Sequence, residues 1–311
     1  MINPGRMVLA LQQNISKAVV GKEEAIEYAL IALLCKGHVL IEDVPGVGKT
    51  TLASALARSL DCSFRRIQFT PDLMPSDLTG INFYNQKKGE FEFRPGPLFA
   101  QIILADEINR ATPRSQAALL EAMEEKQITV DGVTWPMREP YMVMASQNPI
   151  ESYGTFPLPE AQLDRFFMRL RLGYMTREQE ISVLRRPDSR QLLEKLQPVI
   201  EPGELEALRA DFAHVRVDDD IAAYMMDLVE ATRRSELLLA GVSTRGSLAL
   251  FRACQINAAL QGRDYVIPED VKREAVCVLP HRLTLVNQSH LDNVRYVQNL
   301  LDEIPVPLEK L

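Results

Sequence analysis

The ten residues Glu42–Thr51 (EDVPGVGKTT) constrain the fold of this chain more than any other stretch. They directly follow a short apolar run, Val39–Ile41, and open a stretch with a helical pattern. A glycine-rich turn between a strand and a helix directs backbone N–H groups and the positive end of the helix at an anion. The stretch therefore predicts a phosphate-binding loop at the carboxyl edge of a parallel sheet.

The residue types in this loop match the contacts that a nucleotide requires. Lys49 would reach the β- and γ-phosphates, and the Thr50 hydroxyl would ligate Mg²⁺. Asp43 stands where the general pattern GxxxxGK[ST] has its first glycine, so the entry to the loop must differ slightly. The residues predicted to contact the nucleotide here are Pro45, Gly46, Val47, Gly48, Lys49, Thr50 and Thr51.

Polar side chains also follow two other apolar runs. Asp106 and Glu107 end the run that begins at Ile102. We expect Asp106 to hold Mg²⁺ through its waters and Glu107 to polarise the attacking water. Asn148 follows the run Tyr141–Ala145 and could position that water, although a turn-forming Asn before proline is the alternative.

Two arginines are candidates for the cation that stabilises charge on a hydrolysing phosphate. Arg165 precedes the last apolar run, and Arg245 lies at a predicted helix start in the second half of the chain. Such an arginine comes from another subunit or domain. Arg110 and Arg114 are weaker candidates, and a surface ion pair is the usual explanation for a lone arginine.

Apolar runs and helical patterns alternate in the first half of the chain, which is typical of a mostly parallel sheet with helices on its faces. The predicted strands are Val39–Ile41, Phe64–Phe69, Ile102–Ala105, Tyr141–Ala145 and Phe166–Leu170, and the predicted helices are Glu23–Cys35, Thr50–Leu60 and Pro113–Glu125. Two hairpins interrupt them: Ile81–Asn85 with Phe91–Arg94, and Gln127–Val130 with Val133–Trp135. The hairpins are either contact surfaces or edges that cap the fold.

From about Met175 the strand patterns vanish and helices dominate. One helix follows Asp220, a predicted N-cap, and carries Met225 and Met226 as core residues. Further helices follow Thr244 and begin at Pro268. We therefore predict an αβα core over residues 1–174 and an all-helical domain over residues 175–311.

Composition narrows the possible partners. The 311 residues include 35 basic and 42 acidic side chains, a net charge of -7, which argues against a chain that coats DNA or an anionic membrane. No apolar run approaches the roughly 20 residues that span a bilayer, and the four cysteines form no CxxC pair. We predict a cytoplasmic protein with free thiols, and solvated faces for basic clusters such as Arg65-Arg66.

A similarity that covers nearly the whole chain rests on six stretches, in this order: VVGKEEAIEYALIALLCKGHVLIEDVPGVGKTTLA, FTPDLMPSDLTG, FRPGPLF, LADEINRATPRSQAALLEAMEE, ASQNPIESYGTFPLPEAQLDRF and GVSTRGSLAL. Together they resemble the MoxR family of AAA+ ATPases, in which the first Walker A glycine is usually replaced. The resemblance implies a P-loop NTPase (AAA+) core with a five-stranded parallel sheet and a C-terminal all-α lid. The region of about residues 69–97 looks like the helix-2 insert of related proteins.

The resemblance also implies residue roles. Lys49 and Thr50 match Walker A, Asp106 and Glu107 Walker B, Asn148 sensor 1, Arg165 the arginine finger and Arg245 sensor 2, while Val20 and Gly21 match the segment against the adenine. It implies hydrolysis of ATP to ADP with Mg²⁺ by a homo-oligomer, a hexameric ring. Family members act as chaperone-like remodellers, often with a partner bearing a von Willebrand factor A (VWA) domain, and often in maturing metal cofactors.

Two other functions are weighed against this one. A nucleic-acid motor or transcription-regulating AAA+ protein is the alternative, but the chain has no zinc module, helix-turn-helix domain, long basic arm or GAFTGA loop. A nucleotide-dependent scaffold with negligible turnover is the third possibility. The set of Glu107, Asn148 and Arg165 argues against it, because these residues serve hydrolysis rather than binding.

Overall fold

The computed structural model describes residues 4–149, 154–186, 188–286 and 292–307. Its centre is a five-stranded parallel sheet in the order β2-β5-β8-β1-β9. The strands are β1 (Val39–Glu42), β2 (Phe64–Gln68), β5 (Ile102–Asp106), β8 (Met142–Gln147) and β9 (Met168–Leu170). The predicted five-stranded parallel sheet is confirmed, with strand ends that differ from the predicted ones by one or two residues.

Helices cover both faces of the sheet, which explains why the inner strands β5 and β8 are buried along almost their whole length. Ile102 and Leu104 of β5 belong to one core cluster, and Ile103 and Ala105 to another, because successive side chains point to opposite faces. The first cluster includes residues of α1 (Pro4–Ser16), α2 (Glu23–Leu34) and α3 (Lys49–Ser59), and the second includes α5 (Pro113–Glu125). The core is thus a three-layer αβα sandwich.

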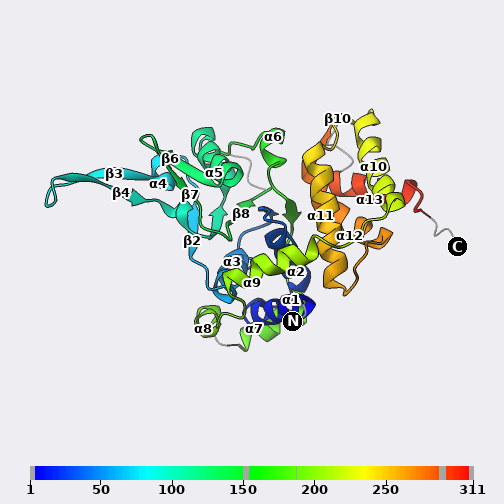
Figure 1. Cartoon of the computed structure of the whole chain (residues 1–311), viewed down its shortest axis with the longest axis horizontal. Helices are drawn as coiled ribbons and strands as arrows, with labels where there is room; N and C mark the ends of the chain where they lie inside the picture. Colours follow the sequence, from blue (N-terminus) through cyan, green and yellow to red (C-terminus); the bar gives the residue numbers. More distant parts are fainter. Residues whose placement is uncertain (1–3, 150–153, 187, 287–291, 308–311) are drawn as a thin grey trace.

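The remaining helices follow the sheet or connect its strands. They are α4 (Pro75–Thr79), α6 (Glu160–Leu163), α7 (Arg177–Leu184), α8 (Ser189–Lys195), α9 (Pro202–Phe212), α10 (Asp219–Arg234), α11 (Thr244–Leu260), α12 (Pro268–Val278) and α13 (Asn293–Glu303). Helices α10 to α13 contact one another in a bundle beside the sheet, whereas α8 contacts α3 and α9 contacts both α2 and α11 (Figure 1). The domain boundary at residues 174 and 175 remains a prediction.

Both predicted hairpins are present. Strands β3 (Gly80–Asn85) and β4 (Glu90–Pro95) project from one end of the molecule (Figure 1), and β6 (Gln127–Val130) pairs with β7 (Val133–Pro136). Phe93 of β4 stacks on Trp135 of β7 with ring centroids 5.0 Å apart, so the two hairpins contact each other.

Three expectations for the second half are wrong. Strands do not vanish, because β10 (Leu238–Ala240) pairs with β11 (Thr284–Leu285). The N-cap of α10 is Asp218 rather than Asp220, because Asp219 and Asp220 already lie in the first turn of the helix. Of the methionine pair only Met225 is buried; Met226 is 39% exposed because adjacent residues on a helix point about 100° apart.

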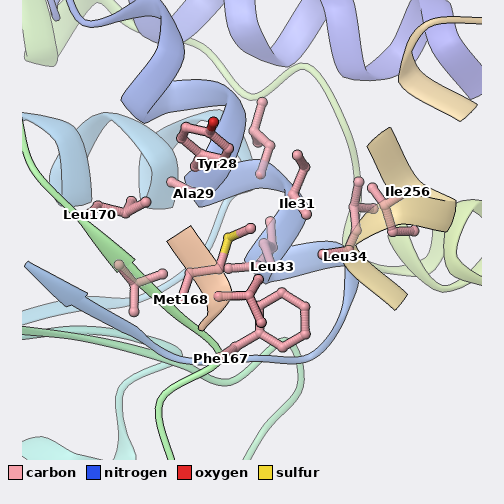
Figure 2. Packing of buried hydrophobic residues seen from close by; sticks show 14 of the residues in the cluster. Tyr28, Ala29, Ile31, Leu33, Leu34, Phe167, Met168, Leu170 and Ile256 are labelled. Carbon is pink, nitrogen blue, oxygen red and sulfur yellow. The ribbon is translucent and has the colours of Figure 1, made fainter. Parts of the chain in front are cut away.

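Helix α2 joins the sheet to the helical bundle. Nine of its twelve residues are buried, since β9 covers one side and α11 another. Figure 2 shows this packing, with Ile31 and Leu34 of α2 near Ile256 of α11, and Leu33 near Met168 of β9. Within the described residues, no helix has the length and apolar character needed to cross a bilayer.

The buried carboxyl of Glu274 on α12 faces this junction. Its side chain is fully buried, and neither carboxyl oxygen has a hydrogen-bond partner among the described residues. Burial raises the pKa of Glu274 to about 8, with Arg273 opposing the shift and Glu27, Asp270 and Glu24 adding to it. The folded protein therefore keeps a proton at neutral pH that the unfolded chain releases.

We expect Glu274→Gln to remove a pH-dependent loss of stability. Because the folded state binds the extra proton, the free energy of unfolding falls as pH rises from about 4.5 to about 8. Glutamine does not titrate, so urea denaturation at pH 8 should show a gain of a few kcal/mol, with little difference near pH 4.5. Glu236→Gln serves as the control, because Glu236 is exposed. If the free energy of unfolding changed with pH in the same way for wild type and Glu274→Gln, the prediction would be contradicted.

Candidate active site

The phosphate loop has the local shape that its sequence predicts. Gly46 has φ of +86° and Gly48, the N-cap of α3, has φ of +100°, a region that side chains with a Cβ rarely adopt. A Cβ at either glycine would meet no heavy atom within 4 Å, so open space borders the loop. The side chain of Lys49 is buried, and its Nζ donates to the main-chain oxygen of Asp43 at 3.0 Å.

A cavity of about 310 Å³ lies at the carboxyl edge of the sheet. It is lined by Pro45, Gly46, Gly48, Lys49, Thr50, Thr51, Arg66, Asp106, Glu107 and Asn148. Strands β5, β8 and β1 are adjacent and parallel, so the residues that follow them meet at one edge. The structure thus brings together the predicted loop, carboxylates and asparagine, while Val47 is buried in the core cluster and is not among the described residues that line the cavity.

The two carboxylates are held in different ways. Asp106 is 9% exposed, and its Oδ1 accepts a hydrogen bond from Ser146 Oγ at 2.5 Å. Glu107 has φ of +56°, which is unusual for a residue with a side chain, and its N–H donates to Ser146 Oγ at 3.0 Å. Strained backbone of this kind clusters at functional sites. Ser146 at the end of β8 therefore positions both carboxylates, a contribution that the sequence analysis missed.

Strand β2 adds two further side chains that were missed. The guanidinium of Arg66 pairs with Asp106 Oδ2 at 2.6 Å, and Gln68 Nε2 donates to Glu107 Oε2 at 2.7 Å. Arg66 belongs to one of the basic clusters, most of which were expected to lie on solvated faces, and its side chain is 48% exposed. It also reaches the carboxylates, because β2 lies beside β5 and places residues 66 and 68 next to them. Arg66 and Gln68 alternate with Ile67 and Phe69, which indicates a polar face on this strand but not which residues that face meets.

Arg165 and Arg245 lie elsewhere. Both pair with Glu124 at the end of α5, at 3.0 Å and 2.5 Å, and neither is among the described residues that line the phosphate cavity. Arg165 precedes β9, and Phe167 N–H donates to the oxygen of His38, just before β1. The pair is therefore near the amino edge of the sheet, roughly 13 Å or more from the phosphate loop across four residues of strand.

The residues beside this arginine pair connect the core to the helical bundle. Asp164 accepts hydrogen bonds from Ser243 Oγ at 2.9 Å and from Arg282 Nε at 2.9 Å. Burial lowers the pKa of Arg282 to about 10, although Asp164 opposes the shift. Because Asp164 precedes Arg165 and Ser243 caps α11 just before Arg245, the same network orients both arginines.

The donor set fits Mg²⁺ bound together with a nucleotide. This ion takes one or two protein oxygens and completes its shell with phosphates and water. Asp106 and Thr50 line the same cavity and supply a carboxylate and a hydroxyl. Among the residues that the structure describes, no group of three or more His, Cys, Asp or Glu side chains could hold a metal by itself.

Comparisons with known proteins agree with this geometry. Residues 38–168 match the model of the ATPase family associated with various cellular activities (AAA), and residues 230–304 match that of the AAA lid domain. The chain is 48% identical over 301 residues to the uncharacterized protein YeaC of Bacillus subtilis, covering 96% of this chain and 94% of the relative. Both family models fall on the elements described above, the first on the sheet and the second on the helical bundle.

Three further similarities extend over most of the chain. It is 39% identical to chaperone MoxR1 of Mycobacterium tuberculosis, covering 94% of this chain and 81% of that protein. It is 31% identical to protein MoxR of Methylorubrum extorquens, covering 95% and 94%. A crystal structure from Cytophaga hutchinsonii superposes with a TM-score of 0.90 at 37% identity, covering 98% of this chain and 96% of the other.

Proposed function

This chain belongs to the MoxR family of AAA+ ATPases, and we propose that it hydrolyses Mg²⁺-bound ATP within a hexameric ring to remodel or mature a protein partner. The observation that supports this best is the single cavity that unites Lys49, Asp106, Glu107 and Asn148. A cavity built only to bind phosphate needs the loop and its lysine but not the second carboxylate and the amide.

Each side chain in the cavity has a separate task in the proposed reaction. The loop amides and Lys49 bind the phosphate oxygens, and Lys49 leaves the oxygen of Asp43 to do so. Glu107 accepts a proton from the attacking water, while Asn148 orients that water. Mg²⁺ held by Thr50 and Asp106 would neutralise charge on the phosphates. Val20 and Gly21, which precede α2, would lie against the adenine.

The position of Arg165 and Arg245 favours a site shared between subunits. They lie near the edge opposite the loop of their own chain, so they can reach a phosphate only in another copy. A head-to-tail contact of this kind generates a ring where its rotation closes, which is the arrangement that we propose. Glu124 keeps both guanidinium groups together until a neighbouring nucleotide replaces it as their anionic partner.

The partner is proposed from the relatives, since one of them is named chaperone MoxR1. We propose a protein partner with a VWA domain, and metal-cofactor maturation as one task. The alternative, a nucleic-acid motor, is disfavoured by the net charge of -7. A DNA-binding titration against salt separates the two, because a motor should show affinity that falls steeply with salt.

In wild type, ATPase activity per subunit should rise with protein concentration as rings form and then reach a plateau.

Glu107→Gln should bind ATP without hydrolysing it. The variant keeps the shape of the side chain but cannot take a proton, so its turnover should fall at least about a hundredfold. Locked with ATP, it should retain a partner in a pull-down.

Lys49→Ala, which should not bind ATP, is the matched control for that pull-down. Normal hydrolysis by Glu107→Gln would refute the assignment of Glu107 as the base. Wild-type protein that binds ATP but shows no turnover at any concentration would instead support a scaffold.

A further inference from the structure

The segment Leu172–Tyr174 follows β9 and leads toward α7, and two buried charged residues hold its main chain. Asp43 is 8% exposed and Lys22 is 6% exposed. A buried charge is costly unless hydrogen bonds satisfy it, so the partners of these two residues indicate what they are for. We call Asp43, Lys22 and Leu172–Tyr174 together the linker clamp.

The carboxylate of Asp43 receives three main-chain N–H groups. Its Oδ2 accepts from the N–H groups of Leu172 and Gly173, each at 2.7 Å, and its Oδ1 accepts from that of Val44 at 2.9 Å. Hydrogen bonds to a charged acceptor are roughly twice as strong as neutral ones. Asp43 thus ties the entry of the phosphate loop to the segment after β9.

The ammonium of Lys22 binds the same segment through its carbonyl groups. Nζ donates to the oxygens of Leu172 and Gly173 at 2.8 Å and of Tyr174 at 3.1 Å, which uses all three of its donors. The C=O of Leu172 and the N–H of Gly173 belong to one peptide group, whose ends point in opposite directions. Lys22 and Asp43 therefore form hydrogen bonds with this peptide group from opposite sides.

Both charged residues also belong to segments of the proposed ATP site. The N–H of Asp43 donates to the oxygen of Gln147 at 3.2 Å, and its carbonyl accepts from Lys49 Nζ at 3.0 Å, a bond that the lysine gives up when it binds phosphate. Lys22 directly follows Val20 and Gly21. The linker clamp thus connects the phosphate loop, the segment proposed to contact adenine and the start of the helical half of the chain.

We propose that Asp43 and Lys22 are positioning residues that couple nucleotide binding at the phosphate loop to the segment Leu172–Tyr174. The inference rests on the proposed ATPase function. It gives a reason for an aspartate at the position where the general loop pattern has glycine: glycine has no side chain to hold the segment. Opening of the clamp then requires distortion of the loop that holds the nucleotide.

Hydrogen exchange tests this coupling directly. A ligand that binds only the closed form lowers the population of the open form in proportion to its excess over Kd, and amide exchange through the open form slows by the same factor. With Mg²⁺ and a non-hydrolysable ATP analogue at about a hundred times Kd, the Leu172 and Gly173 amides of wild type should exchange at least about tenfold more slowly. In Asp43→Asn, at the same excess over its own Kd, the analogue should slow them less than about twofold.

Glu42→Gln is the matched control. It also removes a carboxylate charge beside the loop, but the partner of Glu42 is Arg169 at 2.9 Å and not the linker clamp. It should keep the slowing. Gly173→Ala is a second variant that removes no buried charge: Gly173 has φ of +64°, and a Cβ there would meet no heavy atom within 4 Å. Because alanine disfavours the positive φ that this position has in the linker clamp, the analogue should slow amide exchange less in this variant than in wild type.

Analogue affinity supplies an independent measurement. Asp43→Asn and Lys22→Met should each raise Kd about tenfold, and the double variant should also raise it about tenfold, because either change already frees the segment. A hundredfold, additive loss, or full slowing in Asp43→Asn, would overturn the clamp while leaving the ATPase proposal intact. Wild type that does not bind the analogue would overturn both proposals.

Discussion

Lys49→Ala should raise the Kd for Mg²⁺-bound ATP at least about a hundredfold. Hydrogen bonds from a charged donor are each worth about 1.5–3 kcal/mol, and the lysine would contact two phosphates in a partly buried site. A loss of about 3 kcal/mol corresponds to roughly a hundredfold in affinity. Calorimetric titration with a non-hydrolysable analogue measures it.

Lys126→Ala is the matched control for this loss. Lys126 is a cation outside the phosphate cavity that pairs with Glu139 at 3.0 Å, so its removal should leave Kd within about twofold of wild type. Thermal unfolding of both variants verifies that they fold. Unchanged affinity in a folded Lys49→Ala protein would refute the phosphate-loop assignment.

Arg165→Ala should lower the rate of ATP hydrolysis about a thousandfold while leaving ATP affinity within a few-fold of wild type. An arginine supplied by a neighbour stabilises charge that develops only in the transition state, so kcat falls and ground-state binding does not. Steady-state turnover and equilibrium binding of the analogue, measured on the same preparation, separate the two effects.

Arg234→Ala is the control, because Arg234 is an exposed arginine in the last turn of α10 that pairs with Glu230 on the same helix. It should keep wild-type turnover. An isolated Arg165→Ala protein that hydrolyses ATP at the wild-type rate would remove the case for a site shared between subunits.

The sequence predicted those parts of the site that depend on local order along the chain. The loop between β1 and α3, and the carboxylates after β5, follow from strand, turn and helix signals a few residues apart. Because parallel strands end at one edge of a sheet, their polar ends could be expected to meet. The five-stranded sheet and both hairpins follow from the same short-range patterns.

The missed residues depend instead on which strands are neighbours and in what register. Arg66 and Gln68 reach the carboxylates only because β2 pairs with β5, with Gln68 opposite Asp106. Lys22 meets Leu172 across 150 residues of sequence. The β10–β11 pair likewise joins short segments far apart in the chain. No periodicity of a single segment carries this information, so it came only from the structure.

Mixing two inactive variants tests the shared site most directly. Lys49→Ala retains Arg165, and Arg165→Ala retains the phosphate loop. In a random one-to-one assembly, about a quarter of interfaces combine an intact loop with an intact arginine, so turnover should recover to about a quarter of the wild-type rate. Activity that stays at the level of the separate variants, although mixed assemblies form, would contradict a reaction centre completed by a neighbouring copy.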